Sequence, residues 1–282
     1  MALSINTNLS SIFAQNKLTK STNALGKTFE RLSSGLRINK ASDDAAGLSI
    51  STRMTAQVRG VNQAIRNTND AISAVQVAEG ALNETTSALQ RIRELTVQAA
   101  SDTSYSTDRS DIQKELNQMV YEIQRIATQT TFNKQKVLNG SYLGKKFQVG
   151  ADGAQTITMS ILNTSVVKLG INSTTVKVFS TGQTAAKLQS MANSLIAVVD
   201  RALDSVSDIR ATLGAYQNRF EAVIANLSNM SENTTAARSR IVDADIATET
   251  ANLTRNSILQ QAGTAILAQA NQQPQIALKL LQ

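Results

Sequence analysis

Residues 188–230 read LQSMANSLIAVVDRALDSVSDIRATLGAYQNRFEAVIANLSNM, and the pattern in this stretch decides the fold. Apolar side chains recur at steps that alternate between three and four residues, apart from one doubled step of four at Val206. This spacing places them on one stripe of a helix and is the repeat of a coiled coil. The stripe consists of Leu188, Met191, Leu195, Val198, Ala202, Val206, Ile209, Leu213, Tyr216, Phe220, Val223, Leu227 and Met230.

Two earlier stretches offer partners for this stripe. A heptad pattern runs from Val58 to Leu89, and a shorter one runs from Ile112 to Ile126, where we expect Ser110 and Gln113 to cap the helix. The long stripe can span both, so we predict an antiparallel three-helix bundle. A further helix is predicted to end near Gly35, and another to begin at Ser42, Asp43 and Asp44.

The pattern changes its period between the bundle helices. Phe147 and Val149 alternate with polar residues, as do Ile157 and Met159, and Asp152-Gly153 is a turn sequence. We therefore predict a β-hairpin in the residues 139–185. Residues 176–178 are a candidate for one more short strand.

Both chain ends have helical patterns but almost no charge. Residues 1–16 have no charged side chain, and the only one after Arg255 is Lys279. A helix exposed to water usually keeps a charged side, so these ends are predicted to be covered by other copies of the chain. Amides interrupt them too often for a membrane span. The predicted polymerisation seam consists of Ile5, Leu9, Ile12, Ile258, Ala262, Ala265 and Ile266.

Composition argues against several classes of function. The chain has no His and no Cys, which removes the usual general base, thiol chemistry and the commonest metal ligands. We expect no enzyme, cofactor or metal. The net charge of +7 raises nucleic acid as a partner, but the basic residues look scattered and lack interleaved aromatics. We therefore expect neither a nucleic-acid nor a membrane partner.

The pair Arg91 and Leu95 has two interpretations. They lie four residues apart on one helical face, which points away from the seam in the register that ends at Leu89. Leu95 either belongs to an outward contact surface or packs against the helix that holds Leu116.

Several strings in the chain closely resemble bacterial flagellin. They are residues 39–48 (NKASDDAAGL), 89–95 (LQRIREL), 237–241 (ARSRI) and 258–264 (ILQQAGT). The resemblance covers about residues 1–138 and 188–282. It implies a mainly α subunit with paired terminal helices, which polymerises into the extracellular flagellar filament used for motility. Only residues 139–185 lie between the two arms, so the chain resembles a short form without the variable outer domains.

The resemblance also implies a division into five parts. Residues 1–42 and 243–282 would form the inner coiled coil, and residues 43–138 and 186–242 the bundle. Residues 139–185 would replace the outer domains. The main alternative is the hook–filament junction protein, which has similar ends; a cytosolic coiled-coil scaffold or nucleic-acid binder is a more distant one.

Partners and contact residues follow from the same resemblance. It implies secretion by the flagellar type III apparatus and contacts with an export chaperone, the filament cap and hook-junction proteins. It also implies recognition by host flagellin receptors. A cell-surface receptor and neighbouring subunits would contact Leu89, Gln90, Arg91, Glu94, Leu95 and Glu115. A cytosolic receptor would contact Leu278, Leu280 and Leu281.

Overall fold

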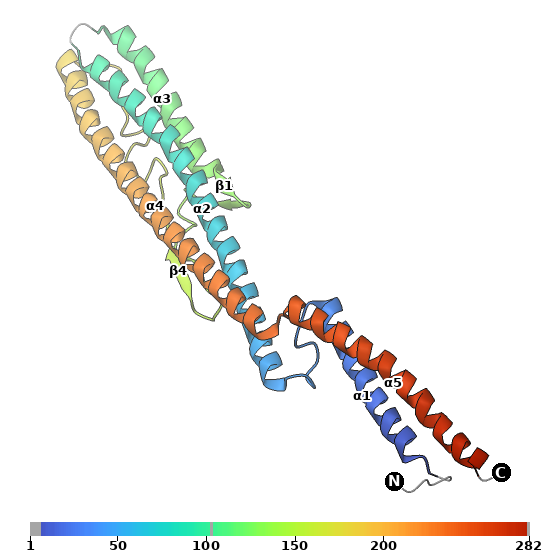
Figure 1. Cartoon of the computed structure of the whole chain (residues 1–282). Coiled ribbons are helices and arrows are strands. Elements are labelled where there is room, and N and C mark those ends of the chain that lie inside the picture. Colours follow the sequence, from blue (N-terminus) through green and yellow to red (C-terminus); the bar gives the residue numbers. More distant parts are fainter. Residues whose placement is uncertain (1–6, 102–103, 281–282) are drawn as a thin grey trace. The chain divides into compact units, whose positions relative to one another are not determined.

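The computed structural model describes residues 7–101 and 104–280, except for the side chains of residue 185 and residues 273–280. Within these ranges the chain is mainly helical (Figure 1), as predicted. It forms two compact units: Met1–Val58 with Glu232–Gln282, and Arg59–Ser231. Among the helices described, none is long and apolar enough to cross a membrane.

The predicted three-helix bundle is confirmed in the unit Arg59–Ser231. It consists of parts of α2 (Ala45–Ala100) and α4 (Ala185–Val242) together with α3 (Ser106–Gln129). One continuous core holds side chains from all three helices, including Leu82, Leu116 and Leu213. The heptad positions are therefore buried, as their spacing predicts, and they form one stripe along each helix.

The start of α3 differs from the prediction. Tyr105 occupies the N-cap, and its backbone N–H donates to Asp108 Oδ2 at 3.1 Å. Ser110, the predicted cap, lies inside the first turns of the helix. Buried Arg109 donates from Nε to the carbonyl of Ala99 at 2.9 Å, so a cation binds the free carbonyls at the end of α2.

Two small antiparallel hairpins follow α3. The predicted hairpin is confirmed: β3 (Lys145–Gln148) pairs with β4 (Thr156–Met159), and Phe147 lies opposite Ile157. A shorter one, β1 (Thr131–Phe132) with β2 (Gln135–Lys136), turns through Asn133 and Lys134, which both have positive φ.

The suggested strand at residues 176–178 is absent. Val176 and Val178 are fully buried, but Gln113 of α3 satisfies their backbone. Its Nε2 donates to the carbonyl of Val176 at 2.8 Å, and its Oε1 accepts from the N–H of Val178 at 2.8 Å. A side chain thus replaces a neighbouring strand here.

The connectors of the other unit hold its helix ends together. α1 (Leu9–Ser34) ends at Gly35, whose φ of 70° suits a residue without Cβ. The carbonyl of Gly35 accepts from Ala244, just before α5 (Ile246–Leu280), at 2.9 Å. Asp44 caps α2 by accepting from the N–H of Gly47 at 2.8 Å, as predicted. Asp43 instead accepts from Asn39 and Lys40 within the connector.

Candidate assembly surface

The two terminal helices, α1 and α5, lie side by side and antiparallel (Figure 1). Their contacts fix the direction. Asn8 Nδ2 donates to the carbonyl of Ala270 at 2.7 Å, and Ser21 Oγ donates to the carbonyl of Asn256 at 3.2 Å. The resemblance to flagellin implied this pairing of the terminal helices.

The seam between these helices combines leucines with small and polar side chains. The buried and half-buried positions include Ser11, Ala14, Leu18, Ser21, Leu25, Thr28 and Leu32 on α1, and Asn256, Gln260, Gly263, Leu267 and Ala270 on α5. Gly263 has no room to spare, because a Cβ there would lie 3.2 Å from Leu18 Cδ1. The small residues let the backbones approach closely, and the leucines supply apolar contacts.

Several other large apolar side chains of the pair face outward. Leu9 is 73% exposed, Phe13 64%, Ile258 59% and Ile266 58%. We call this set the terminal apolar faces; it comprises Leu9, Ile12, Phe13, Ile258, Leu259 and Ile266. Ala262 and Ala265 are exposed beside them, whereas Ile5 lies outside the described residues. The predicted stripe on α5 is therefore present, but it faces away from α1.

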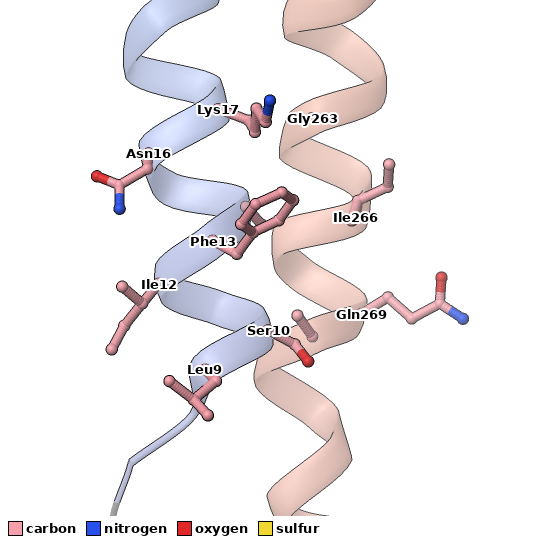
Figure 2. Close-up of a pocket in the computed structure, with 11 residues that line it drawn as sticks. Leu9, Ser10, Ile12, Phe13, Asn16, Lys17, Gly263, Ile266 and Gln269 are labelled. Atoms are coloured by element: carbon pink, nitrogen blue, oxygen red, sulfur yellow. The ribbon is translucent and has the colours of Figure 1, made fainter. Parts of the chain in front are cut away.

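The two faces border a groove of about 770 Å³ near the end of the helix pair. Figure 2 shows Phe13 of α1 lying between the two helices, with Ile266 of α5 across from it. Lys17 Nζ lies 5.4 Å from the centroid of the Phe13 ring, a distance that suits a cation–π contact. Apart from Lys17, the side chains that line the groove are uncharged.

The ion pairs of this unit lie away from the groove. Arg31 Nη1 lies 3.2 Å from Glu249 Oε1, and Lys40 Nζ lies 2.7 Å from Glu30 Oε1. The bond to Glu30 raises the pKa of Lys40. Residues 7–16 and 256–272 contain no charged side chain at all. A partner that covers these stretches therefore has no ion to desolvate, which makes their burial inexpensive.

A second predicted surface lies on α2 and α3. Arg91 Nη2 lies 2.9 Å from Glu115 Oε1, and Arg91 Nη1 lies 3.1 Å from Glu94 Oε2. The hydrogen bond to Glu115 is the main cause of a raised pKa at Arg91, followed by the bond to Glu94. Together with the exposed Gln90, these residues form one polar patch across two helices.

Leu89 and Leu95 do not belong to that polar patch. Leu89 is fully buried and Leu95 is only 3% exposed, in the same core cluster as Leu116. The expectation of an outward Leu95 is wrong, because this end of α2 contacts both α3 and α4. Its buried arc is accordingly wider than a heptad seam and includes Ile92, Leu95 and Thr96.

The remaining predicted positions lie at the end of the chain. Leu278 and Leu280 belong to α5, and Leu281 lies outside the described residues. Across residues 7–101 and 104–280, no three acidic, His or Cys side chains come together in a way that could hold a metal ion.

Comparisons with known proteins agree with this architecture. The family model of the bacterial flagellin N-terminal helical region matches residues 5–142, and that of the C-terminal helical region matches residues 196–281. A flagellin of Xenorhabdus nematophila is 46% identical, over 100% of both chains. A flagellin of Halalkalibacterium halodurans is also 46% identical, over 98% of this chain and 99% of its own length.

A solved structure from Vibrio parahaemolyticus, provisionally described as a flagellar hook-associated protein, is similar in fold. It has a TM-score of 0.62 over 71% of this chain and 100% of that chain, but only 12% sequence identity. That likeness shows the fold alone. The relatives that match at high identity over their whole length are filament subunits by name, and they do not favour the junction-protein alternative.

Proposed function

Since the chain belongs to the bacterial flagellin family and is a structural subunit of the flagellar filament, we propose that its terminal apolar faces are the surfaces through which subunits polymerise. The observation that carries this proposal is the placement of side chains on α1 and α5. Leucines together with small and polar groups face the partner helix, while a separate set that includes Leu9, Phe13 and Ile266 faces outward.

Rough energetics support this assignment. Full burial of one large apolar side chain contributes about 1.5–3 kcal/mol, so burial of these six contributes on the order of 10 kcal/mol before the entropy cost of association. The contact is heterologous, because a stripe on one copy meets a different surface on the next. Heterologous contacts that do not close a ring produce an open helical filament.

Seeded polymerisation tests the proposal. The full-length Ile258→Ser/Ile266→Ser variant should fail to extend short filament seeds, as measured by sedimentation. The matched control, Leu162→Ser/Val167→Ser, also removes two side chains that are more than half exposed, and it should extend seeds normally. Equal elongation by both variants would refute the assignment of the seam.

The proposal also covers export, the proteins that assist assembly, and host receptors. We propose secretion by the flagellar type III apparatus, with contacts to an export chaperone, the filament cap and hook-junction proteins. Host recognition would use the exposed residues Gln90, Arg91 and Glu94 with half-buried Glu115, while Leu89 and Leu95 support them from the core. A cytosolic receptor would contact Leu278, Leu280 and Leu281. What supports these proposals is family membership; the polar patch adds an exposed, ordered surface.

A further inference from the structure

The excess positive charge of the chain is concentrated in one segment. Of the 28 basic and 21 acidic residues, eight basic residues and one acidic residue lie in residues 123–199, which leaves 20 of each sign elsewhere. The net charge of +7 therefore belongs entirely to this segment. The basic residues are hardly denser here than elsewhere, with 8 in these 77 residues and 20 in the other 205, so the excess arises because acidic residues are nearly absent from the segment.

Five of these basic residues lie in the non-helical part of the bundle unit, and hydrogen bonds link the segments that carry them. We call Lys134, Lys136, Lys145, Lys146 and Lys168 the lysine cluster. Ser141 Oγ donates to the carbonyl of Lys136 at 3.0 Å, which joins the first hairpin to the approach to β3. The N–H of Thr164 donates to the carbonyl of Leu138 at 3.0 Å, which brings the turn containing Lys168 to the same place.

The cluster is accessible and its charges are not neutralised. Four of the five side chains are exposed, and Lys145 is half-buried with its Nζ 5.7 Å from the centroid of the Tyr142 ring. Within the described parts of the chain, no ion pair joins any of the five to a carboxylate. On the neighbouring helix α3, by contrast, the charge of Arg125 is compensated by an ion pair with Glu122.

We propose that the lysine cluster binds acidic polysaccharides. A concentration of unpaired cations attracts any polyanion, and its attraction weakens as salt screens it. Compact ammonium groups on flexible stems suit irregularly spaced sulfate and carboxylate groups. Base recognition needs exposed aromatic platforms, and here Tyr142 is buried while Phe132 and Phe147 are only half exposed.

This inference rests on the proposed function, because it requires the chain to be part of an extracellular filament. An extracellular filament meets polyanions mainly as acidic polysaccharides, and a polymer presents the cluster many times, so weak sites add up to strong attachment. The cluster also lies in or next to residues 139–185, the place where the resemblance puts the outer domains. Figure 1 shows this green-to-yellow segment running alongside the bundle helices.

Binding of the full-length chain to immobilised heparin, a sulfated polysaccharide, tests the proposal. The variant Lys134→Gln/Lys136→Gln/Lys145→Gln/Lys146→Gln should bind roughly tenfold more weakly or worse at low salt, with a shallower salt dependence. The control Arg53→Gln/Arg59→Gln/Arg66→Gln/Arg201→Gln removes the same charge from exposed helical positions and should bind nearly as well as the parent. Circular dichroism checks that both variants fold.

Equal losses in the two variants would overturn the proposal, because total charge rather than the cluster would then control binding. Duplex DNA that binds as tightly as heparin at equal salt would overturn the choice of polysaccharide. Filaments that form but do not bind, while monomers do, would show that assembly covers the cluster, and would also overturn it. Monomers that bind but never polymerise would instead refute the proposed function and leave the cluster assignment standing.

Discussion

Arg31 on α1 and Glu249 on α5 form an ion pair across the terminal helices, with Nη1 and Oε1 3.2 Å apart. The Glu249 side chain is only 10% exposed, so it depends on Arg31 for compensation. This pair lies near one end of a seam that otherwise consists of leucines and of small and polar groups. It holds the two helices in register while the terminal apolar faces remain outside.

Loss of the Glu249 carboxylate should weaken the helix pair. Glu249→Ala leaves Arg31 without its partner, at a cost of about 1–2 kcal/mol. We expect the helix pair to order fully only when subunits assemble, so the critical concentration for polymerisation should rise roughly tenfold. Glu249→Gln keeps an acceptor oxygen and should raise the critical concentration less. An unchanged critical concentration for the Ala variant would show that the ion pair does not stabilise the pair.

Leu95 and Arg91 should differ sharply in their effect on stability, although they are one helical turn apart. Leu95→Ala opens a cavity in the bundle core and should lower the free energy of unfolding by about 2–5 kcal/mol. Arg91→Ala removes an exposed side chain and should change it little. Urea unfolding of the two full-length variants measures this difference, and a tolerated Leu95→Ala would contradict the burial of Leu95.

The Gln113 side chain should control how well the segment after β4 is held. Gln113→Ala removes the bonds to the backbone of Val176 and Val178, which costs about 1–2 kcal/mol locally. Limited proteolysis should then cut residues 170–184 faster, with little change in global unfolding. Gln217→Ala is the control, since the half-buried Gln217 donates to Glu221 within α4. Equal cleavage rates in parent and Gln113→Ala chains would refute this role.

The start of α5 should be sensitive to acid. Hydrogen bonds from the Thr248 hydroxyl, and then from the N–H groups of Thr248 and Ala247, lower the pKa of Asp245 below its ordinary value of 3.8. A depressed pKa stabilises the fold fully above the ordinary value and loses that contribution as the pH falls through the folded-state pKa. The helix pair should therefore be insensitive to pH near neutrality and weaken below about pH 3.8.

Asp245→Asn isolates this effect from the other carboxylates. Asparagine is also a good N-cap but does not titrate, so the variant should lose less ellipticity than the parent between pH 4 and pH 2. The difference between the two acid titration curves is the measurement. Identical curves would mean that ionised Asp245 does not stabilise α5.

The bundle was predictable because its seams repeat over many turns. Val206, Leu213 and Phe220 lie where the alternating steps placed them, and all three are buried. The hairpin of β3 and β4 was predictable because apolar and polar residues alternate in both strands and a turn sequence lies between them. Both signals are local and come from the periodicity of one element at a time.

The missed features depend on neighbours that periodicity does not reveal. Leu95 is buried because two helices pack against that end of α2. β1 and β2 have two residues each, too few to establish an alternation, and Asn133-Lys134 lacks the glycine that usually marks such a turn. Val176 and Val178 alternate like a strand, but a side chain satisfies their backbone. The sequence revealed the apolar stripe on α5, but it could not show that α1 packs against a different face of that helix.

The exposure of Ile266 before and after polymerisation tests the central claim most directly. The chain has no cysteine, so Ile266→Cys and Thr181→Cys each provide one thiol for maleimide labelling. Both thiols should react readily in the monomer, and in filaments only the one at position 266 should become protected. Equal labelling of position 266 in monomers and filaments would contradict the account, because neighbouring subunits would then leave the terminal apolar faces uncovered.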